Sequence, residues 1–251
     1  MKTKGLTQDQ QLKNKQPAGL VITIDGPAGA GKTTVSRAVA QRLGYRYVDT
    51  GALYRGVALA AMSNGIAADD DDGLDRMCTD LELTFSKREN GNPRLILNGS
   101  DVTGLIRTPE ISMLASDVSA RPVVRRFLLE LQRKMGREQC VVFEGRDMGT
   151  VVFPEADVKI FLSASHKARA LRRFNEMAGA SDQSLDQVAD EIRRRDENDS
   201  GRELAPLKPA IDAVIIDSTA LSIDDVVDKI LEQVNKMRTF IDKKNETEKA
   251  K

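Results

Sequence analysis

Residues 26–33 read Gly26-Pro27-Ala28-Gly29-Ala30-Gly31-Lys32-Thr33, which matches the pattern G-x-x-x-x-G-K-[ST] at every fixed position. An apolar, mainly β-branched run at 20–24 precedes them and predicts a buried strand. A helical pattern follows them and ends at Gly44. Glycines let backbone N–H groups surround an anion, and a helix N-terminus adds positive potential. The sequence therefore predicts a phosphate-binding loop between a strand and a helix.

The residue types of this loop predict how it binds a nucleoside triphosphate. Lys32 carries a point charge that reaches the β- and γ-phosphates, and the Thr33 hydroxyl can ligate Mg²⁺. The predicted ATP-binding residues are Gly26, Pro27, Ala28, Gly29, Ala30, Gly31, Lys32, Thr33 and Thr34.

Strands alternate with helices along most of the chain. The four further buried strands are expected at 45–49, 140–143, 158–162 and 213–216. Helical patterns separate these runs, which indicates an α/β fold with a five-stranded parallel sheet and helices on both faces. Ligands of such sheets bind at the carboxyl ends of the strands.

Two segments interrupt this alternation. Residues 81–85 alternate apolar and polar side chains, Asn90-Gly91-Asn92-Pro93 predicts a turn, and 94–97 predicts a second strand. We therefore expect a small antiparallel insert at 77–107. Residues 180–209 are polar and rich in arginine, which is typical of a lid that closes over transferring phosphates.

The domain boundaries follow from these segments. The expected core comprises 18–76 and 108–235, with the lid inside it. Residues 1–17 are expected to form a disordered extension and 236–251 a mobile charged tail. A last helix is expected to begin at Ser222, with Asp225 three residues on as a capping box.

Composition excludes several classes of protein. The 251 residues carry 38 Lys plus Arg and 38 Asp plus Glu, so the net charge of zero argues against nucleic-acid or membrane partners. His166, Cys78 and Cys140 are too few for a four-ligand zinc site, and the two cysteines are expected to be buried thiols. No signal peptide or membrane-length apolar run is visible, so we expect a cytoplasmic location.

Two arginines follow predicted strands at the edge where ligands bind. Arg55 comes soon after 45–49, and Arg146 follows 140–143. Arginine at this place suits a second phosphate, which it can bind through bidentate hydrogen bonds. The alternative for each is a surface ion pair. Glu144 is predicted to hold Mg²⁺ through water, the alternative being an ordinary loop carboxylate.

The lid contains Arg195, Asp199 and Arg202, whose i, i+4, i+7 spacing places them on one face of a helix. The alternative is a plain pair on a helix surface. Beside a phosphate loop, this arginine-rich set is predicted to belong to a lid that closes over the transferring phosphates.

Several sequence stretches carry a family resemblance. The chain contains GPAGAGK at 26–32, DTGALYR at 49–55, EGRDMGTVVFP at 144–154 and RDENDSGR at 195–202. Over roughly 20–235 it resembles the bacterial cytidylate kinases, which are nucleoside monophosphate kinases of the P-loop group. The resemblance implies transfer of phosphate from ATP to CMP or dCMP with Mg²⁺, by a monomer, in pyrimidine nucleotide metabolism.

The resemblance also implies which residues bind CMP. The phosphate would meet Thr50, Arg55 and Arg146, the cytosine would meet Ser116, Arg125 and Asp147, and the sugar side would meet Arg195, Asp199 and Arg202. The catalytic residues would be Lys32, Arg146, Arg195 and Arg202. An alternative for Asp147 is an ion pair with a neighbouring arginine. Thr50 replaces a serine common in the family, and Asn198 replaces a lid arginine that some members carry.

The scarcity of histidine fits a phosphate acceptor. A phosphate monoester has a second pKa near 6 and is largely a dianion at neutral pH, so it needs no general base. Two alternatives stay open. A P-loop kinase for a hydroxyl substrate would use a carboxylate base such as Asp49. A nucleotide-dependent switch would have no second substrate, although the N-K-x-D motif of GTPases is absent.

Overall fold

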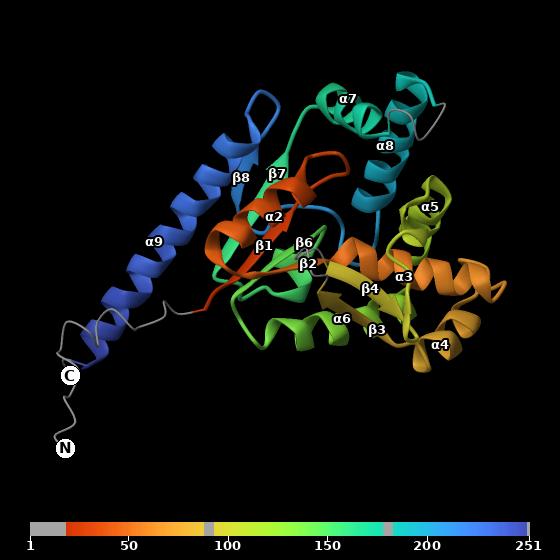
Figure 1. Cartoon of the computed structure of the whole chain (residues 1–251), viewed down its shortest axis with the longest axis horizontal. Helices are drawn as coiled ribbons and strands as arrows, with labels where there is room; N and C mark the ends of the chain where they lie inside the picture. Colours follow the sequence, from red (N-terminus) through yellow and green to blue (C-terminus); the bar gives the residue numbers. More distant parts are fainter. Residues whose placement is uncertain (1–18, 88–92, 178–182, 250–251) are drawn as a thin grey trace, which may run out of the picture.

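The computed structural model describes residues 19–87, 93–177 and 183–249 (Figure 1). Several predictions lie outside the described residues: the N-terminal extension at 1–17, the turn at 90–92, the first lid residues at 180–182 and the last two residues of the tail.

The central sheet has five parallel strands, as the sequence predicts, and their order is β2-β6-β1-β7-β8. The strands are β1 (Val21–Asp25), β2 (Arg46–Asp49), β6 (Val141–Gly145), β7 (Val158–Ser163) and β8 (Val214–Asp217). In the register of the sheet Asp25 lies beside Gly145, and Asp49 lies beside Glu144. The carboxyl ends of β1, β2 and β6 therefore meet at one edge.

Helices cover both faces of the sheet. On one face α2 (Lys32–Leu43) and α9 (Ile223–Lys249) pack their apolar stripes against β1 and β7. On the other face α3 (Thr50–Ser63) and α6 (Pro122–Gly136) lie over β2 and β6. Figure 1 shows α9 at one end of the molecule and α3 and α4 at the other. None of the described helices combines the length and apolar character of a membrane span.

The predicted start of the last helix is confirmed, but its end differs. The amide of Asp225 donates to Ser222 Oγ at 3.1 Å, and the amide of Ser222 donates to Asp225 Oδ2 at 3.1 Å. The helix α9 then continues to Lys249 instead of giving way to a tail near 236. Lysine and glutamate in this segment are good helix formers, and the Glu232–Lys236 pair is spaced i, i+4.

The antiparallel insert is present and contains one more strand than expected. It comprises β3 (Leu83–Lys87), β4 (Pro93–Leu97) and the two-residue strand β5 (Ser100–Asp101). The insert follows α4 (Asp71–Thr79) and packs on α3. The chain then returns through η1 (Leu105–Arg107) and α5 (Pro109–Val118) to α6.

The helix of the predicted lid packs on the helix that precedes it, beside the phosphate loop. The helices α7 (His166–Glu176) and α8 (Leu185–Ser200) pack through Ala170, Val188 and Ile192. His166 is the first residue of α7 and is exposed. The prediction of two buried thiols is correct for Cys78 and wrong for Cys140. Cys140 lies just before β6 in a turn, with φ 49°, and its side chain is exposed.

Candidate active site

The phosphate loop has the geometry that its glycines predict. Gly26 has φ 150°, and a Cβ there would lie 2.0 Å from the carbonyl oxygen of Leu162. Gly29 has φ 73°, which is also unfavourable for other residues. Lys32 Nζ donates to the carbonyl oxygen of Pro27 at 2.7 Å, so the side chain folds back over the loop.

Two buried charges stand at the base of this loop. Burial, and then the neighbouring charge of Arg146, lowers the pKa of Lys32 to about 7. Burial, and then the carboxylate of Asp49, raises the pKa of Glu144 to about 7. A bound polyanion would restore the full charge of Lys32, because an opposite charge favours the protonated form.

Glu144 closes the same end of the site. The Thr33 hydroxyl donates to Glu144 Oε1 at 2.8 Å, which joins α2 to the end of β6. The second oxygen, Oε2, is buried and accepts no hydrogen bond from the described residues. These two side chains are the predicted magnesium residues, and the structure brings them together. Within the described ranges no cluster of three or more His, Cys, Asp or Glu residues could hold a metal ion alone.

Arg55 reaches the cleft from α3, which follows β2, and Arg146 reaches it from just after β6. Arg55 Nη2 pairs with Asp49 Oδ2 at 2.9 Å, and Arg146 Nε pairs with Asp199 Oδ2 at 2.8 Å. Both guanidinium groups are mostly buried by protein yet line the cleft. The two arginines are therefore held by carboxylates beside the phosphate loop.

Thr50 begins α3 and is almost fully buried. Its hydroxyl donates to the carbonyl oxygen of Glu144 at 2.6 Å. A hydroxyl has one proton, so in this arrangement Thr50 has none left for a phosphate oxygen. A contact with the acceptor phosphate requires the bond to Glu144 to break.

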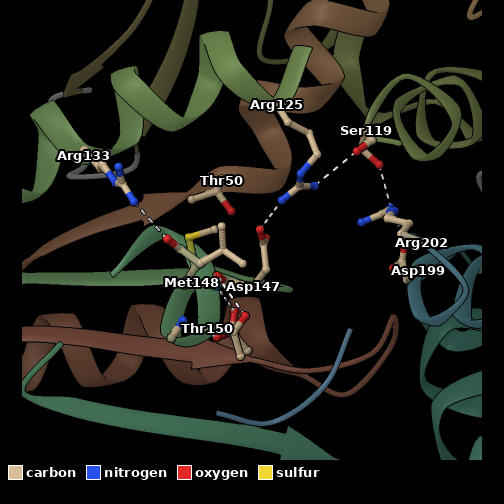
Figure 2. Close-up of polar contacts among 12 residues, drawn as sticks. Thr50, Ser119, Arg125, Arg133, Asp147, Met148, Thr150, Asp199 and Arg202 are labelled. Atoms are coloured by element: carbon tan, nitrogen blue, oxygen red, sulfur yellow. Dashed lines mark hydrogen bonds and ion pairs between the residues drawn. The ribbon is translucent and has the colours of Figure 1, made fainter. Parts of the chain in front are cut away.

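A second polar group lies farther along the cleft (Figure 2). The carboxylate of Asp147 forms a close ion pair with Arg125, which is the alternative that the sequence left open for Asp147. Burial raises the pKa of Asp147, and the charge of Arg125 opposes that shift. Ser116 also lines the cleft, and its Oγ is buried without a hydrogen-bond partner among the described residues.

The sequence missed two residues of this group. Arg125 Nη1 donates to the carbonyl oxygen of Ser119 at 3.2 Å, and the Ser119 hydroxyl accepts from Arg202 Nη2 at 2.6 Å (Figure 2). Tyr54 places its ring 6.0 Å from the guanidinium carbon of Arg125. Tyr54 lies within the DTGALYR stretch, whereas no local pattern marks Ser119.

The lid residues converge on Asp199. This carboxylate binds both Arg146 and Arg202. Burial alone would raise the pKa of Asp199, but the two arginines hold it below its usual value. Arg195 lines the same cleft, and burial followed by the charge of Arg146 lowers its pKa to about 10.

The expected helical position of Arg202 is wrong. The helix α8 ends at Ser200 with Gly201 as its cap, so only Arg195 and Asp199 share a helix face. Arg202 instead turns back toward Asp199 from beyond the helix end. The ion pair between Arg202 and Asp199 forms all the same, because it requires only that the two charged groups lie close together and not that both residues belong to the helix.

Asp25 positions the turn that follows Arg146 and Asp147. Its two carboxylate oxygens accept from the backbone N–H groups of Met148 and Gly149, at 2.9 and 2.8 Å. Burial raises the pKa of Asp25 to about 6. Asp25 directly precedes Gly26, so one residue at the end of β1 connects the phosphate loop to the second half of the site.

A single cleft of about 590 Å³ gathers most of the predicted residues. It is lined by Ala28, Gly29, Gly31, Lys32, Thr33, Thr34, Thr50, Arg55, Ser116, Arg125, Glu144, Arg146, Asp147, Arg195, Asp199 and Arg202. Gly26, Pro27 and Ala30 of the predicted ATP site shape the loop but do not line the cleft. Arg107 and Arg173 line it as well, and the sequence did not single them out.

A phosphate loop and a cluster of arginines that face one cleft define a P-loop kinase, in which one wall suits a donor triphosphate and the other an anionic acceptor. Comparison with known proteins specifies the family. The family model described as Cytidylate kinase matches residues 22–236, and the chain belongs to this family.

The sequence is similar to those of curated cytidylate kinases over nearly the whole length of each relative. The chain is 57% identical over 213 residues to the cytidylate kinase of Geobacter sulfurreducens, covering 84% of this chain and 91% of the relative. It is 51% identical over 228 residues to that of Syntrophotalea carbinolica, covering 90% and 97%. It is 46% identical over 216 residues to that of Carboxydothermus hydrogenoformans, covering 86% and 97%.

Proposed function

We propose that this chain transfers the γ-phosphate of ATP to CMP or dCMP, giving ADP and CDP or dCDP. The observation that carries the proposal is the shared cleft, in which Lys32 of the phosphate loop and the arginines Arg55 and Arg146 face the same space. A volume of about 590 Å³ lies within the range of ordinary ligand pockets.

Arg55 and Arg146 would bind the phosphate of CMP. Arg55 lies in the second turn of α3, which begins directly after β2, and Arg146 directly follows β6, so both lie at the edge of the sheet next to the loop that would hold the γ-phosphate. Their carboxylate partners, Asp49 and Asp199, fix the guanidinium planes before the substrate arrives. Positioning of this kind lowers the cost of aligning two anionic substrates.

Arg125 and Asp147 would select cytosine. Cytosine has a donor, its 4-amino group, beside acceptors on the same edge of the ring. A carboxylate paired with a guanidinium presents the matching acceptor and donors, and the unpartnered hydroxyl of Ser116 adds one more polar group. Uracil would place a carbonyl oxygen against the carboxylate of Asp147, so two acceptors would face each other with no proton between them.

Arg195, Asp199 and Arg202 would close over the sugar side of CMP and the phosphate being transferred. Asp199 provides an acceptor for a sugar hydroxyl while it holds Arg146 and Arg202. Arg195 adds a third cation, which forms no ion pair with the described residues, although the charges of Asp199 and Glu191 act on it. Its charge is thus the one that an incoming phosphate would compensate.

The residues at the base of the loop fit Mg²⁺. Magnesium prefers oxygen ligands and keeps several waters. Thr33 provides a hydroxyl, and Glu144 provides a buried carboxylate oxygen that no described residue occupies. Thr33 would bind the ion directly and Glu144 through water. When bound, the ion would neutralise charge on the phosphates.

Catalysis would rest on alignment and charge rather than on a base. Lys32, Arg146, Arg195 and Arg202 would stabilise the charge on the transferred group. The alternative of a hydroxyl substrate needs Asp49 as a base. The carboxylate of Asp49 already accepts from the amide of Ala52 at 3.0 Å and pairs with Arg55, which disfavours that alternative.

An initial-rate assay of ADP release tests the proposal. ATP and Mg²⁺ are supplied with CMP, dCMP, UMP, a panel of hydroxyl metabolites, or no acceptor. We expect rapid release with CMP or dCMP and little with the rest. Faster release with a hydroxyl metabolite would support the other kinase class, and acceptor-independent release would support a nucleotide switch. The expectation of a monomer is tested by the molecular mass in solution.

A further inference from the structure

One buried arginine outside the cleft contacts both sides of the site. Arg169 lies in the first turn of α7, and its side chain is 8% exposed. Nη1 donates to the carbonyl oxygen of Ala28 in the phosphate loop at 3.0 Å. The same nitrogen pairs with Asp196 Oδ2 on the lid helix α8 at 2.6 Å. Neither Arg169 nor Asp196 lines the cleft, so their role is not direct contact with substrate.

The contact with the phosphate loop is closely packed. A Cβ at Gly29 would lie 2.9 Å from the backbone oxygen of Arg169 and 3.1 Å from its Cβ. Arg169 Nε also donates to the carbonyl oxygen of Ala164, at the end of β7, at 3.1 Å. The guanidinium therefore cannot follow a movement of α8 without straining these contacts.

The bond to Ala28 lies on a peptide unit that faces the donor phosphates. The carbonyl of Ala28 and the N–H of Gly29 belong to one planar trans peptide and point in opposite directions. Gly29 lines the cleft, where loop N–H groups bind phosphate. A phosphate on the Gly29 N–H would polarise the Ala28 carbonyl and strengthen its bond to Arg169, because hydrogen bonds in series reinforce each other.

The other end of this connection lies among the acceptor arginines. Asp196 follows Arg195 directly and precedes Asp199 by three residues on α8. Its charge also acts on Arg146. The second oxygen of Asp196, Oδ1, is buried without a hydrogen-bond partner among the described residues, so Arg169 is its main fixed contact.

We propose that Arg169 and Asp196 are positioning residues that couple the two substrate sites. An occupied phosphate loop holds the Arg169 guanidinium, which holds Asp196 and so sets α8 at the position where Arg195 and Asp199 meet CMP. The inference rests on the proposed function. By linkage, ATP would raise the affinity for CMP and CMP would raise the affinity for ATP by the same factor.

The test is a double-mutant cycle on the coupling factor. Arg169→Gln, Asp196→Asn and the double variant are titrated with CMP, without and with a non-hydrolysable ATP analogue and Mg²⁺. The coupling factor is the ratio of the two dissociation constants. Site-to-site coupling is commonly about 5- to 150-fold. We expect the wild type to fall in that range and each single variant to approach 1, with no further loss in the double variant.

The control keeps the same helix and removes an exposed ion pair. Asp190→Asn breaks the pair of Asp190 with Arg193 at 2.7 Å, and we expect wild-type coupling. If Arg169→Gln does not fold, Asp196→Asn decides alone, because it is nearly isosteric and leaves the bond to Ala28 in place.

Three outcomes would overturn the proposal. The first is a wild type without coupling between ATP and CMP. The second is single variants whose coupling factor and CMP affinity both equal those of the wild type. The third is single variants that keep the coupling factor while their CMP affinity and thermal stability both fall. The last outcome would mean that the pair only docks α8 on α7. A failure of the proposed function is distinguishable, because wild-type protein would then not bind CMP under either condition.

Discussion

The substitution Arg146→Ala should weaken the binding of the acceptor CMP without weakening the binding of the donor ATP. In the structure Arg146 binds Asp199 at 2.8 Å and the carbonyl oxygen of Gly145 at 3.2 Å, and its remaining guanidinium surface lines the cleft. One lost charge-assisted bond to the CMP phosphate is worth about 1.5–3 kcal/mol. At about 1.4 kcal/mol per decade, the affinity for CMP should fall by roughly one to two decades.

The affinity for ATP should not fall in Arg146→Ala. The charge of Arg146 contributes to the lowered pKa of Lys32. Its removal should let Lys32 hold its proton more firmly, so ATP should bind as well as before or better. The stability should also decrease, because among the described residues Asp199 would keep an ion pair with Arg202 alone.

Calorimetric titration with CMP and, separately, with ATP measures both affinities. Arg126→Ala is the control, because Arg126 neighbours Arg125 in sequence but forms an exposed ion pair with Asp75. We expect this control to match the wild type for both nucleotides. An equal fall in ATP and CMP affinity in Arg146→Ala would place Arg146 on the donor and refute the assignment.

Three further predictions concern base choice, protonation and stability. Asp147→Asn should lower kcat/KM for CMP and narrow the ratio of CMP to UMP, since an amide can donate to the uracil oxygen; an unchanged ratio in initial-rate assays would remove Asp147 from base selection. Binding of ADP at pH 8 in a chelator should take up protons, because phosphate raises the pKa of Lys32 from about 7, so the affinity should decrease as the pH rises above 7. Calorimetry in two buffers of different ionisation enthalpy measures this uptake, and its persistence in Lys32→Met would contradict the reasoning. Asp25→Asn should lower the free energy of unfolding by about 1–3 kcal/mol, because one amide N–H of the turn loses its acceptor. Folding raises the pKa of Asp25 to about 6, so at intermediate pH the folded wild type binds a proton that the unfolded chain does not. The contribution of this proton to the free energy of unfolding is therefore lost as the pH rises through 6. Denaturation at several pH values should therefore show the difference between the two proteins shrinking from pH 4 to 7, and a constant difference would contradict the shift.

The fold was predictable where a local pattern carries it. Strands buried on both faces are continuous apolar runs, and the glycines and Lys32 of the phosphate loop are adjacent in sequence. The strand β5 was not predictable, because Ser100 and Asp101 are too few and too polar to form a pattern. The end of α9 was misjudged because charged residues favour both a solvated tail and an exposed helix.

The sequence predicted which residues form the candidate site better than it predicted the contacts among them. Arg202 and Ser119 are 83 residues apart, and Arg125 and Asp147 are 22 apart, so no spacing in the sequence indicates these bonds. The lid carboxylate Asp196 lies inside the RDENDSGR stretch, yet only the packing of α7 on α8 brings Arg169 to it. Contacts between distant elements depend on tertiary structure, which local patterns do not encode.

Direct observation of the transferred phosphorus tests the central claim. Enzyme, Mg²⁺, CMP and ATP labelled at the γ-phosphate are mixed, and the label is followed by separating the nucleotides over time. We expect the label to appear in the β-phosphate of CDP, in a one-to-one ratio with the ADP formed. Label released as inorganic phosphate while CMP stays unchanged would contradict it.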